Sequence, residues 1–179
     1  MTQKSLTAVY LRRGKEESLE RCHPWIFSGA IERITEGLKP LSEGDIVDVY
    51  TKQGNFIARG HYQIGSIAVR VLSFEEESID QAWWNRRIAA AKALRESLGM
   101  VDNAQTSCYR LIHGEGDLLP GLVVDIYERT AVVQCHSVGM YHSRSQIAEA
   151  IREAYGDRIE AIYDKSSQTL PYKAELGAI

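Results

Sequence analysis

A histidine and two carboxylates lie close together in the segment His113-Gly114-Glu115-Gly116-Asp117. These side-chain types perform general acid–base catalysis when they meet in one site. A small hydrolase using this segment is therefore one hypothesis, although no Gly-x-Ser-x-Gly, P-loop or His-Glu-x-x-His signature occurs in the chain. Glycine and proline in the same stretch favour a structural turn instead. We expect that structural loop to be built from Gly114, Glu115, Asp117, Pro120 and Gly121.

The same segment imitates two cofactor motifs without completing either. His113-Gly114-Glu115 matches the first half of a zinc deaminase motif, but no Pro-Cys-x-x-Cys follows. The Gly114-x-Gly116 pair follows a strand as in a dinucleotide-binding loop, yet it leads into another strand-like run where a helix should begin. The three cysteines, Cys22, Cys108 and Cys135, lie in or beside apolar segments, which favours inert thiols. The sequence thus predicts no catalytic residue, no metal site and no bound cofactor.

Two short clusters suit contact with phosphate better. Arg12-Arg13-Gly14-Lys15 supplies cations, and His23-Pro24-Trp25 supplies aromatic surface. Cationic groups bind backbone phosphates, and a tryptophan ring can stack on a base. Arg59-Gly60-His61 adds a third polar group, with a glycine that permits close backbone approach. The alternatives are a solvated arginine pair and a tryptophan in the core. The predicted RNA-binding residues are Arg12, Arg13, Lys15 and Arg59 on phosphates, with His23 and Trp25 against the RNA or supporting its groove.

Composition narrows the protein classes. The 179 residues carry 21 Lys and Arg against 24 Asp and Glu, a net charge of −3. Residues 1–75 carry +1 and residues 76–179 carry −4, so nucleic-acid contact would need a local basic patch. Without a Cys-x-x-Cys pair or an apolar run approaching the ~18 residues of a membrane span, we expect a cytoplasmic protein with no membrane partner.

These clusters must be positioned by two kinds of element. Up to residue 74, short alternating runs at 6–11, 45–50, 56–59 and 66–73 predict the strands of a small β-barrel. A helix should follow at 78–98, with a capping box at Ser78-Ile79-Asp80-Gln81. Its expected apolar stripe is Trp84, Ile88, Ala91, Leu94 and Leu98.

The remainder predicts a small α+β domain. Strands are expected at 108–113, 122–127, 130–136 and 158–163, with a helix at 143–155 before the last strand. Residues 164–179 show no period, and we expect the chain to have been cut there. The predicted fold class is mixed α+β, a small β-barrel followed by a small α+β domain.

Several strings of residues resemble one family. Residues 23–31, HPWIFSGAI, with GDIVDV at 44–49 and ARG at 58–60, look like the PUA domain of the SAM-dependent rRNA cytosine-C5 methyltransferases. Residues 109–125, YRLIHGEGDLLPGLVVD, are similar to the central α+β domain of that family. The resemblance covers essentially the whole chain.

This resemblance implies a PUA-like RNA-binding barrel at 1–74, a linking helix at 75–100 and a central domain at 101–179. In the family, a C-terminal Rossmann methyltransferase domain holds S-adenosylmethionine and the nucleophilic cysteine. We therefore expect a truncated, catalytically inactive fragment whose parent uses S-adenosylmethionine, with large-subunit ribosomal RNA and the missing methyltransferase domain as partners.

An alternative from a different class is a protein-docking or assembly scaffold. The negative net charge favours it, and the partner would be a catalytic domain or a second subunit, including a homodimer. An exposed apolar surface, including Trp83 or Trp84, is then expected.

Overall fold

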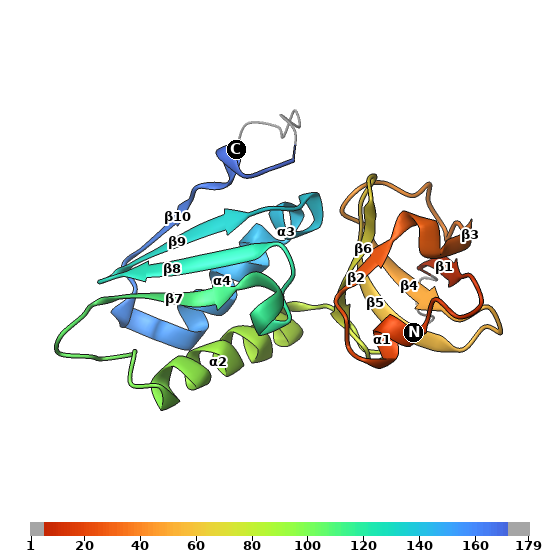
Figure 1. The fold of residues 1–179 in the computed structure, drawn as a ribbon. Helices are drawn as coiled ribbons and strands as arrows, with labels where there is room; N and C mark the ends of the chain where they lie inside the picture. Colours follow the sequence, from red (N-terminus) through yellow and green to blue (C-terminus); the bar gives the residue numbers. More distant parts are fainter. Residues whose placement is uncertain (1–5, 172–179) are drawn as a thin grey trace. The chain divides into compact units, whose positions relative to one another are not determined.

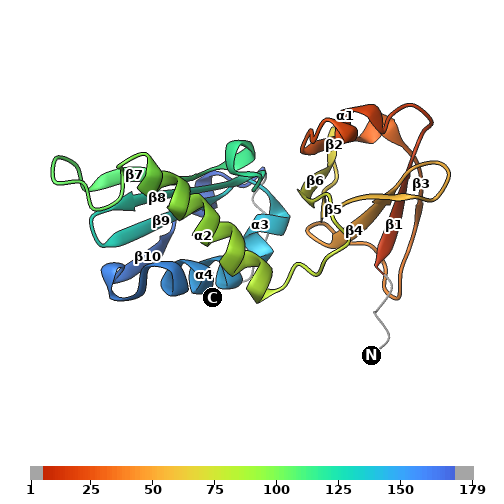
Figure 2. The same cartoon turned by 90° about the horizontal axis from the view of Figure 1, so that it is seen from below.

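The computed structural model describes residues 6–171 of the chain. The chain divides into two compact units, Met1–Glu77 and Ser78–Ile179. Each unit contains its own β-sheet and is described by itself (Figures 1 and 2). The mixed α+β class predicted from the sequence is confirmed.

The first unit is a curled six-stranded sheet that forms a half-barrel (Figure 1). Its strand order is β2-β6-β5-β4-β1-β3, and only the β1–β4 pair is parallel. The four strands expected from alternation are all present. The elements are β1 (Thr7–Leu11), α1 (Glu17–Glu20), β2 (Trp25–Phe27), β3 (Ile31–Thr35), β4 (Ile46–Tyr50), β5 (Phe56–Tyr62) and β6 (Ile67–Ser73).

Alternation along the strands builds the core of this half-barrel. Val47 and Val49 in β4 are fully buried and belong to one cluster with Val9 and Leu11 of β1. Side chains two residues apart in a strand share a face, so each strand contributes a row to the same interior. Strand β3 escaped prediction because it lies at the sheet edge and has no buried residue, only Ile31 being half-buried.

Strands β5 and β6 approach each other unusually closely at Gly60. A Cβ atom at this position would lie 2.2 Å from the carbonyl oxygen of Arg70, so any larger residue must push the two strands apart. The sequence indicated that this glycine allows a close backbone approach. The approaching segment is the neighbouring strand, not a ligand.

The second unit is a two-layer α+β arrangement. Its four-stranded sheet has the order β10-β9-β8-β7, and two helices, α2 and α4, lie along one face (Figures 1 and 2). Strands β9 and β10 are parallel, and helices α3 and α4 connect them. The elements are α2 (Gln81–Ser97), β7 (Cys108–His113), β8 (Leu122–Tyr127), β9 (Thr130–Cys135), α3 (Val138–His142), α4 (Arg144–Tyr155) and β10 (Ala161–Asp164).

Helix α2 differs from its expectation at both ends. Its N-cap is Asp80, whose carboxylate accepts a hydrogen bond from the Trp83 backbone N–H at 2.9 Å, so the predicted capping box starting at Ser78 is wrong. Leu94 and Leu98 are exposed although both were expected inside. Arg95 is buried instead, because its side chain forms an ion pair with Asp117 inside the second unit.

Trp83 and Trp84 are both buried, at 1% and 0% exposure, so the expectation that one of them lies on an open apolar surface is wrong. Their rings meet edge to face at 4.9 Å. Helix α2 packs against α4 and β7, within the second unit. In the stretch 164–179 the sequence showed no period, and the structure has a short 3₁₀ turn there at Ser166–Gln168. Residues 172–179 of this stretch lie outside the described part of the chain.

Candidate RNA-binding surface

A tight turn presents the predicted cations of the first unit. The Lys15 backbone N–H donates to the Arg12 carbonyl at 3.1 Å, and Gly14 takes a φ of +77°, which suits glycine. Arg12, Arg13 and Lys15 are all exposed. The Arg12 Nε donates to the Ile31 carbonyl at 3.1 Å, which orients its guanidinium. Within residues 6–171 none of the three cations forms an ion pair, so their charges are available to an anion.

Strand β2 carries aromatic rings on its outer face. Trp25 is half-buried and Phe27 is 50% exposed, while Ile26 between them points into the core. The rings of Trp25 and Phe27 are perpendicular, with centroids 6.4 Å apart. His23 lies edge-on to Trp25 at 5.9 Å and tilted against Phe27 at 6.5 Å. Because β2 is a sheet edge, these rings line an open flank of the half-barrel.

The turn and the aromatic rings share one hollow. A cavity of about 350 Å³ lies between α1 and β2, and it is lined by Lys15, Ser18, Trp25, Ile26, Phe27, Gly29 and Ala30. The views in Figures 1 and 2 place α1 beside β2. The structure therefore brings Lys15 to Trp25, and it adds Phe27, which the sequence reasoning missed. The signal for Phe27 was present, because Trp25 and Phe27 are two residues apart and side chains at that spacing in a strand share a face.

Arg59 does not belong to this surface. Its side chain is buried, and it forms a two-point ion pair with Asp48, with Nε–Oδ1 at 2.6 Å and Nη2–Oδ2 at 3.0 Å. Its remaining amino group donates to the Glu77 carbonyl. The hydrogen bond to Asp48 raises the pKa of Arg59 above its usual value. With its donors engaged in this way, Arg59 is a structural residue, and the expectation that it holds a phosphate is wrong.

The loop around His113 forms an anchored turn. Residues Gly114–Asp117 make one 3₁₀ turn, and the Asp117 carboxylate accepts a hydrogen bond from the His113 backbone N–H at 2.6 Å. Asp117 also forms an ion pair with Arg95 of α2. Glu115 is exposed and Pro120 is buried. Because the Asp117 carboxylate is already engaged with Arg95 and a backbone amide, it holds the turn together, and the arrangement does not favour hydrolysis.

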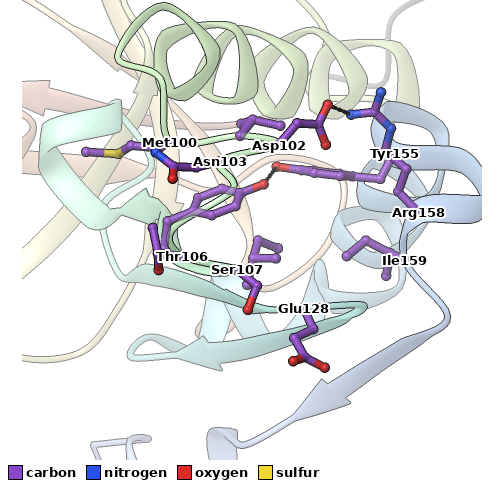
Figure 3. A pocket seen from close by; sticks show the side chains of 12 residues that line it. Met100, Asp102, Asn103, Thr106, Ser107, Glu128, Tyr155, Arg158 and Ile159 are labelled. Carbon is purple, nitrogen blue, oxygen red and sulfur yellow. Dashed lines mark hydrogen bonds and ion pairs between the residues drawn. The ribbon is translucent and has the colours of Figure 1, made fainter.

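The second unit has hollows of its own, and two of them bear on function. The smaller, about 150 Å³, contains the hydroxyl pair of Tyr109 and Tyr155, 2.9 Å apart, beside an ion pair of Arg158 and Asp102 at 2.6 Å (Figure 3). Burial raises the pKa of both tyrosines, and the hydrogen bond that Tyr155 shares with Tyr109 raises the pKa of Tyr155 further. Both phenols therefore stay protonated near neutral pH, which excludes a tyrosinate nucleophile there.

The larger hollow, about 670 Å³, is a mainly apolar groove between the end of α2 and β7. Leu94, Leu98 and Met100 line it and are 48%, 60% and 40% exposed. Within the described residues no group of three or more His, Cys, Asp or Glu side chains is placed to hold a metal ion, and no helix is long and apolar enough to cross a membrane.

Comparison with known proteins identifies the first unit. Residues 9–74 match the sequence profile of the PUA-like domain family. Residues 9–74 are a PUA-like domain. This match spans the turn at Arg12–Lys15, the aromatic face of β2 and the Arg59–Asp48 pair.

Several curated relatives are named ribosomal RNA large subunit methyltransferase I. The enzyme named ribosomal RNA large subunit methyltransferase I from Photobacterium profundum is 39% identical over 172 residues, which is 95% of this chain and 42% of the relative. The enzyme of the same name from Escherichia coli strain SMS-3-5 is 41% identical over 160 residues, 88% of this chain and 39% of the relative. The chain is thus homologous to these enzymes, with the PUA-like domain included, and it spans about two fifths of their length.

Solved structures share the fold. A Streptococcus mutans protein assigned as a SAM-dependent methyltransferase superposes with a TM-score of 0.72 at 18% identity, covering 88% of this chain and 40% of that one. A second protein assigned as a methyltransferase, solved with S-adenosylhomocysteine, gives a TM-score of 0.70 at 19% identity over 90% and 40% of the two chains. At these identities the likeness concerns the fold alone.

Proposed function

We propose that this chain is the RNA-binding and central portion of a SAM-dependent rRNA cytosine-C5 methyltransferase, and that its PUA-like domain positions large-subunit ribosomal RNA. The observation that carries this proposal is the hollow between α1 and β2, which is lined by Lys15, by the half-buried ring of Trp25 and by the exposed ring of Phe27. The names of the homologues support a ribosomal RNA substrate. Cytosine C5 as the target atom rests on the resemblance of residues 23–31 and 109–125 to that family.

On this surface the cations and the aromatic rings would bind different parts of the RNA. Arg12, Arg13 and Lys15 have no ion-pair partner among the described residues, so an RNA phosphate gains contacts without breaking a bridge. The rings on β2 offer flat apolar surface on which bases stack. Since the net charge of the whole chain is −3, the attraction for RNA must come from this local patch of cations.

The described residues do not fit an S-adenosylmethionine site. The only strand–helix–strand crossover with parallel strands in residues 78–171 runs from β9 through α3 and α4 to β10, and the turn after β9 is Cys135-His136-Ser137, without a glycine loop. The Ser166 and Thr169 hydroxyls hydrogen-bond to the Cys135 backbone at 3.0 and 2.7 Å, which covers the end of β9. Cofactor-binding loops need glycines and an open strand end at this point. We therefore expect the chain alone to be catalytically inactive, with S-adenosylmethionine bound elsewhere in the parent enzyme.

The test is fluorescence anisotropy of a labelled large-subunit rRNA fragment titrated with the chain at several salt concentrations. Three phosphate contacts to single-stranded RNA predict a log–log salt slope of about −2. An Arg12→Ala, Arg13→Ala, Lys15→Ala variant should lose this slope and most of the affinity. The control removes three exposed cations elsewhere, Lys52, Arg129 and Arg152, whose side chains are 52%, 56% and 62% exposed. If both triple variants bind alike, the turn at Arg12–Lys15 is not the RNA site.

A docking role is the second candidate, and the apolar groove beside Leu94, Leu98 and Met100 favours it. Here the groove would receive an apolar segment of the catalytic methyltransferase domain, and in its absence the chain would self-associate as a homodimer. Light scattering over a dilution series, with Leu98→Asp as the matched variant, distinguishes the cases. A monomer at every concentration with unchanged RNA affinity argues against this role.

The compartment proposed is the cytoplasm. Cys22, Cys108 and Cys135 are all free thiols, as a reducing compartment allows.

A further inference from the structure

We propose that the hollow between α1 and β2 is a slot for one unpaired nucleobase, held by Trp25 and Phe27, with Lys15 on the adjoining phosphate. This inference rests on the proposed RNA-binding function and deepens it, because it names single-stranded RNA with an exposed base as the ligand. Duplex RNA of the same charge could bind the cations through its phosphates, but its paired bases could not stack on the rings.

The walls of the hollow have the right chemistry for a base. The Trp25 and Phe27 rings are perpendicular at 6.4 Å, so they form two sides of a corner and not a closed stack. A planar base can lie flat on one ring and present its edge to the other. The cavity of about 350 Å³ has room for one base and falls at the lower end of the sizes seen for small-molecule sites.

The rings are held in place before any ligand arrives. The Nδ1 atom of His23 lies 3.2 Å from the Trp25 backbone nitrogen, which donates to it, and 3.3 Å from the Trp25 carbonyl. This contact leaves the Nε2 edge of His23 as the edge that can meet a ligand. Trp25 itself is fixed in the β2–β6 pairing opposite Arg70. A preorganised aromatic corner avoids the entropic cost of ordering side chains on binding.

The exposure of Phe27 is otherwise unexplained. A phenylalanine 50% exposed on a sheet edge leaves apolar surface in water, and its neighbour Ile26 already supplies the core contact of this strand. Lys15 lines the same hollow, so a cation lies beside the rings and can bind the phosphate of a stacked nucleotide. An apolar ring paired with a cation matches a nucleotide better than it matches a purely apolar protein segment.

The experiment uses anisotropy to compare three kinds of RNA of equal length. The first is a hairpin with an unpaired loop, and the second is a series of the same hairpin in which each loop nucleotide in turn is made abasic. The third is a fully paired duplex. We expect the unpaired loop to bind more tightly than the weakest-binding of the abasic RNAs by about 5- to 150-fold, the range for one stacked base. Intrinsic fluorescence adds a direct readout, because Trp83 and Trp84 are buried and Trp25 alone can meet the base. Stacking should quench the Trp25 emission with the loop RNA and not with the duplex.

Two variants separate stacking from support of the strand. Phe27→Leu keeps an apolar side chain and removes the ring, so it should abolish the preference for the unpaired loop while the protein stays folded. Ile34→Ala, at the other edge of the same sheet and 38% exposed, is the matched control and should bind like the parent. Equal affinity for loop, abasic and duplex RNA with unchanged Trp25 emission overturns the slot and leaves RNA binding standing. Failure of the chain to bind any of the three RNAs overturns both proposals.

Discussion

The Arg95 guanidinium on helix α2 forms a two-point ion pair with the Asp117 carboxylate in the turn after β7, one of the two contacts measuring 2.8 Å. Both side chains are nearly buried. Arg95 also donates to the Arg110 carbonyl at 3.0 Å, so one side chain ties the helix to both ends of the segment 110–117.

Asp117→Ala should therefore destabilise the second unit, by about 3–5 kcal/mol, because it leaves the Arg95 charge buried without a partner. It should also expose the His113 amide to hydrogen exchange, since Asp117 accepts its hydrogen bond. Urea unfolding followed by fluorescence of Trp83 and Trp84 measures the first effect. The control is Glu160→Ala, which breaks an exposed pair with Arg129 and should cost no more than about 1 kcal/mol. Similar losses in both variants would contradict a special role for the buried pair.

Arg59→Met should lower the stability of the PUA-like domain by about 3–5 kcal/mol, because Asp48 then keeps its charge without its partner. The protein that remains folded should bind RNA as the parent does, since Arg59 faces Asp48 and not the hollow. Thermal unfolding and anisotropy below the transition separate the two effects. Adding Asp48→Leu should restore much of the lost stability, because removing both charges leaves no unpaired charge in the interior. A clear fall in RNA affinity at full folding would return Arg59 to the binding surface.

Gly60→Ala should destabilise the same domain by about 1–3 kcal/mol or more, since the new methyl group would overlap the Arg70 carbonyl oxygen of β6. Gly54→Ala is a useful comparison, because nothing lies within 4 Å of its Cβ position and its cost arises from a φ of +90° alone. Both are measured by urea unfolding. Only Gly60→Ala should also weaken RNA binding, because β6 carries β2 and its rings.

The second unit should lose stability in alkali. Burial raises the pKa of the Cys135 thiol from 9.0 to about 11, and burial also raises the pKa values of Tyr109 and Tyr155. Folding therefore favours the protonated forms, so this stability is complete below about pH 9 and is lost as the pH rises toward 11. Unfolding by urea at pH 8 and pH 10.5 should differ by about 1–3 kcal/mol. Cys135→Ala should reduce that difference, and equal stability at both pH values would contradict the prediction.

The alternation of apolar and polar residues predicted most strands of both sheets. It did not predict contacts between residues that are distant in the sequence. Val47 and Val49 face the core as their spacing indicates, and the four strands of the second unit lie near their expected ranges. Arg59 and Arg95 both read as surface cations, because their partners Asp48 and Asp117 are on other elements. The sequence brought the cations of the turn and Trp25 into one hypothesis. It did not single out Phe27, although the two-residue spacing from Trp25 indicated that both rings share a strand face.

The pairing of β2 with β6 makes the aromatic hollow a late product of folding. Trp25 lies opposite Arg70, so the strand that carries the rings is held by one of the last segments of the domain to be synthesised. Contacts between such distant residues form slowly, because the intervening chain must first be closed into a loop. Until β6 has left the ribosome, β2 lacks the strand with which it pairs, and the rings have no fixed position. Ligand recognition through these rings therefore reports that the half-barrel has been completed.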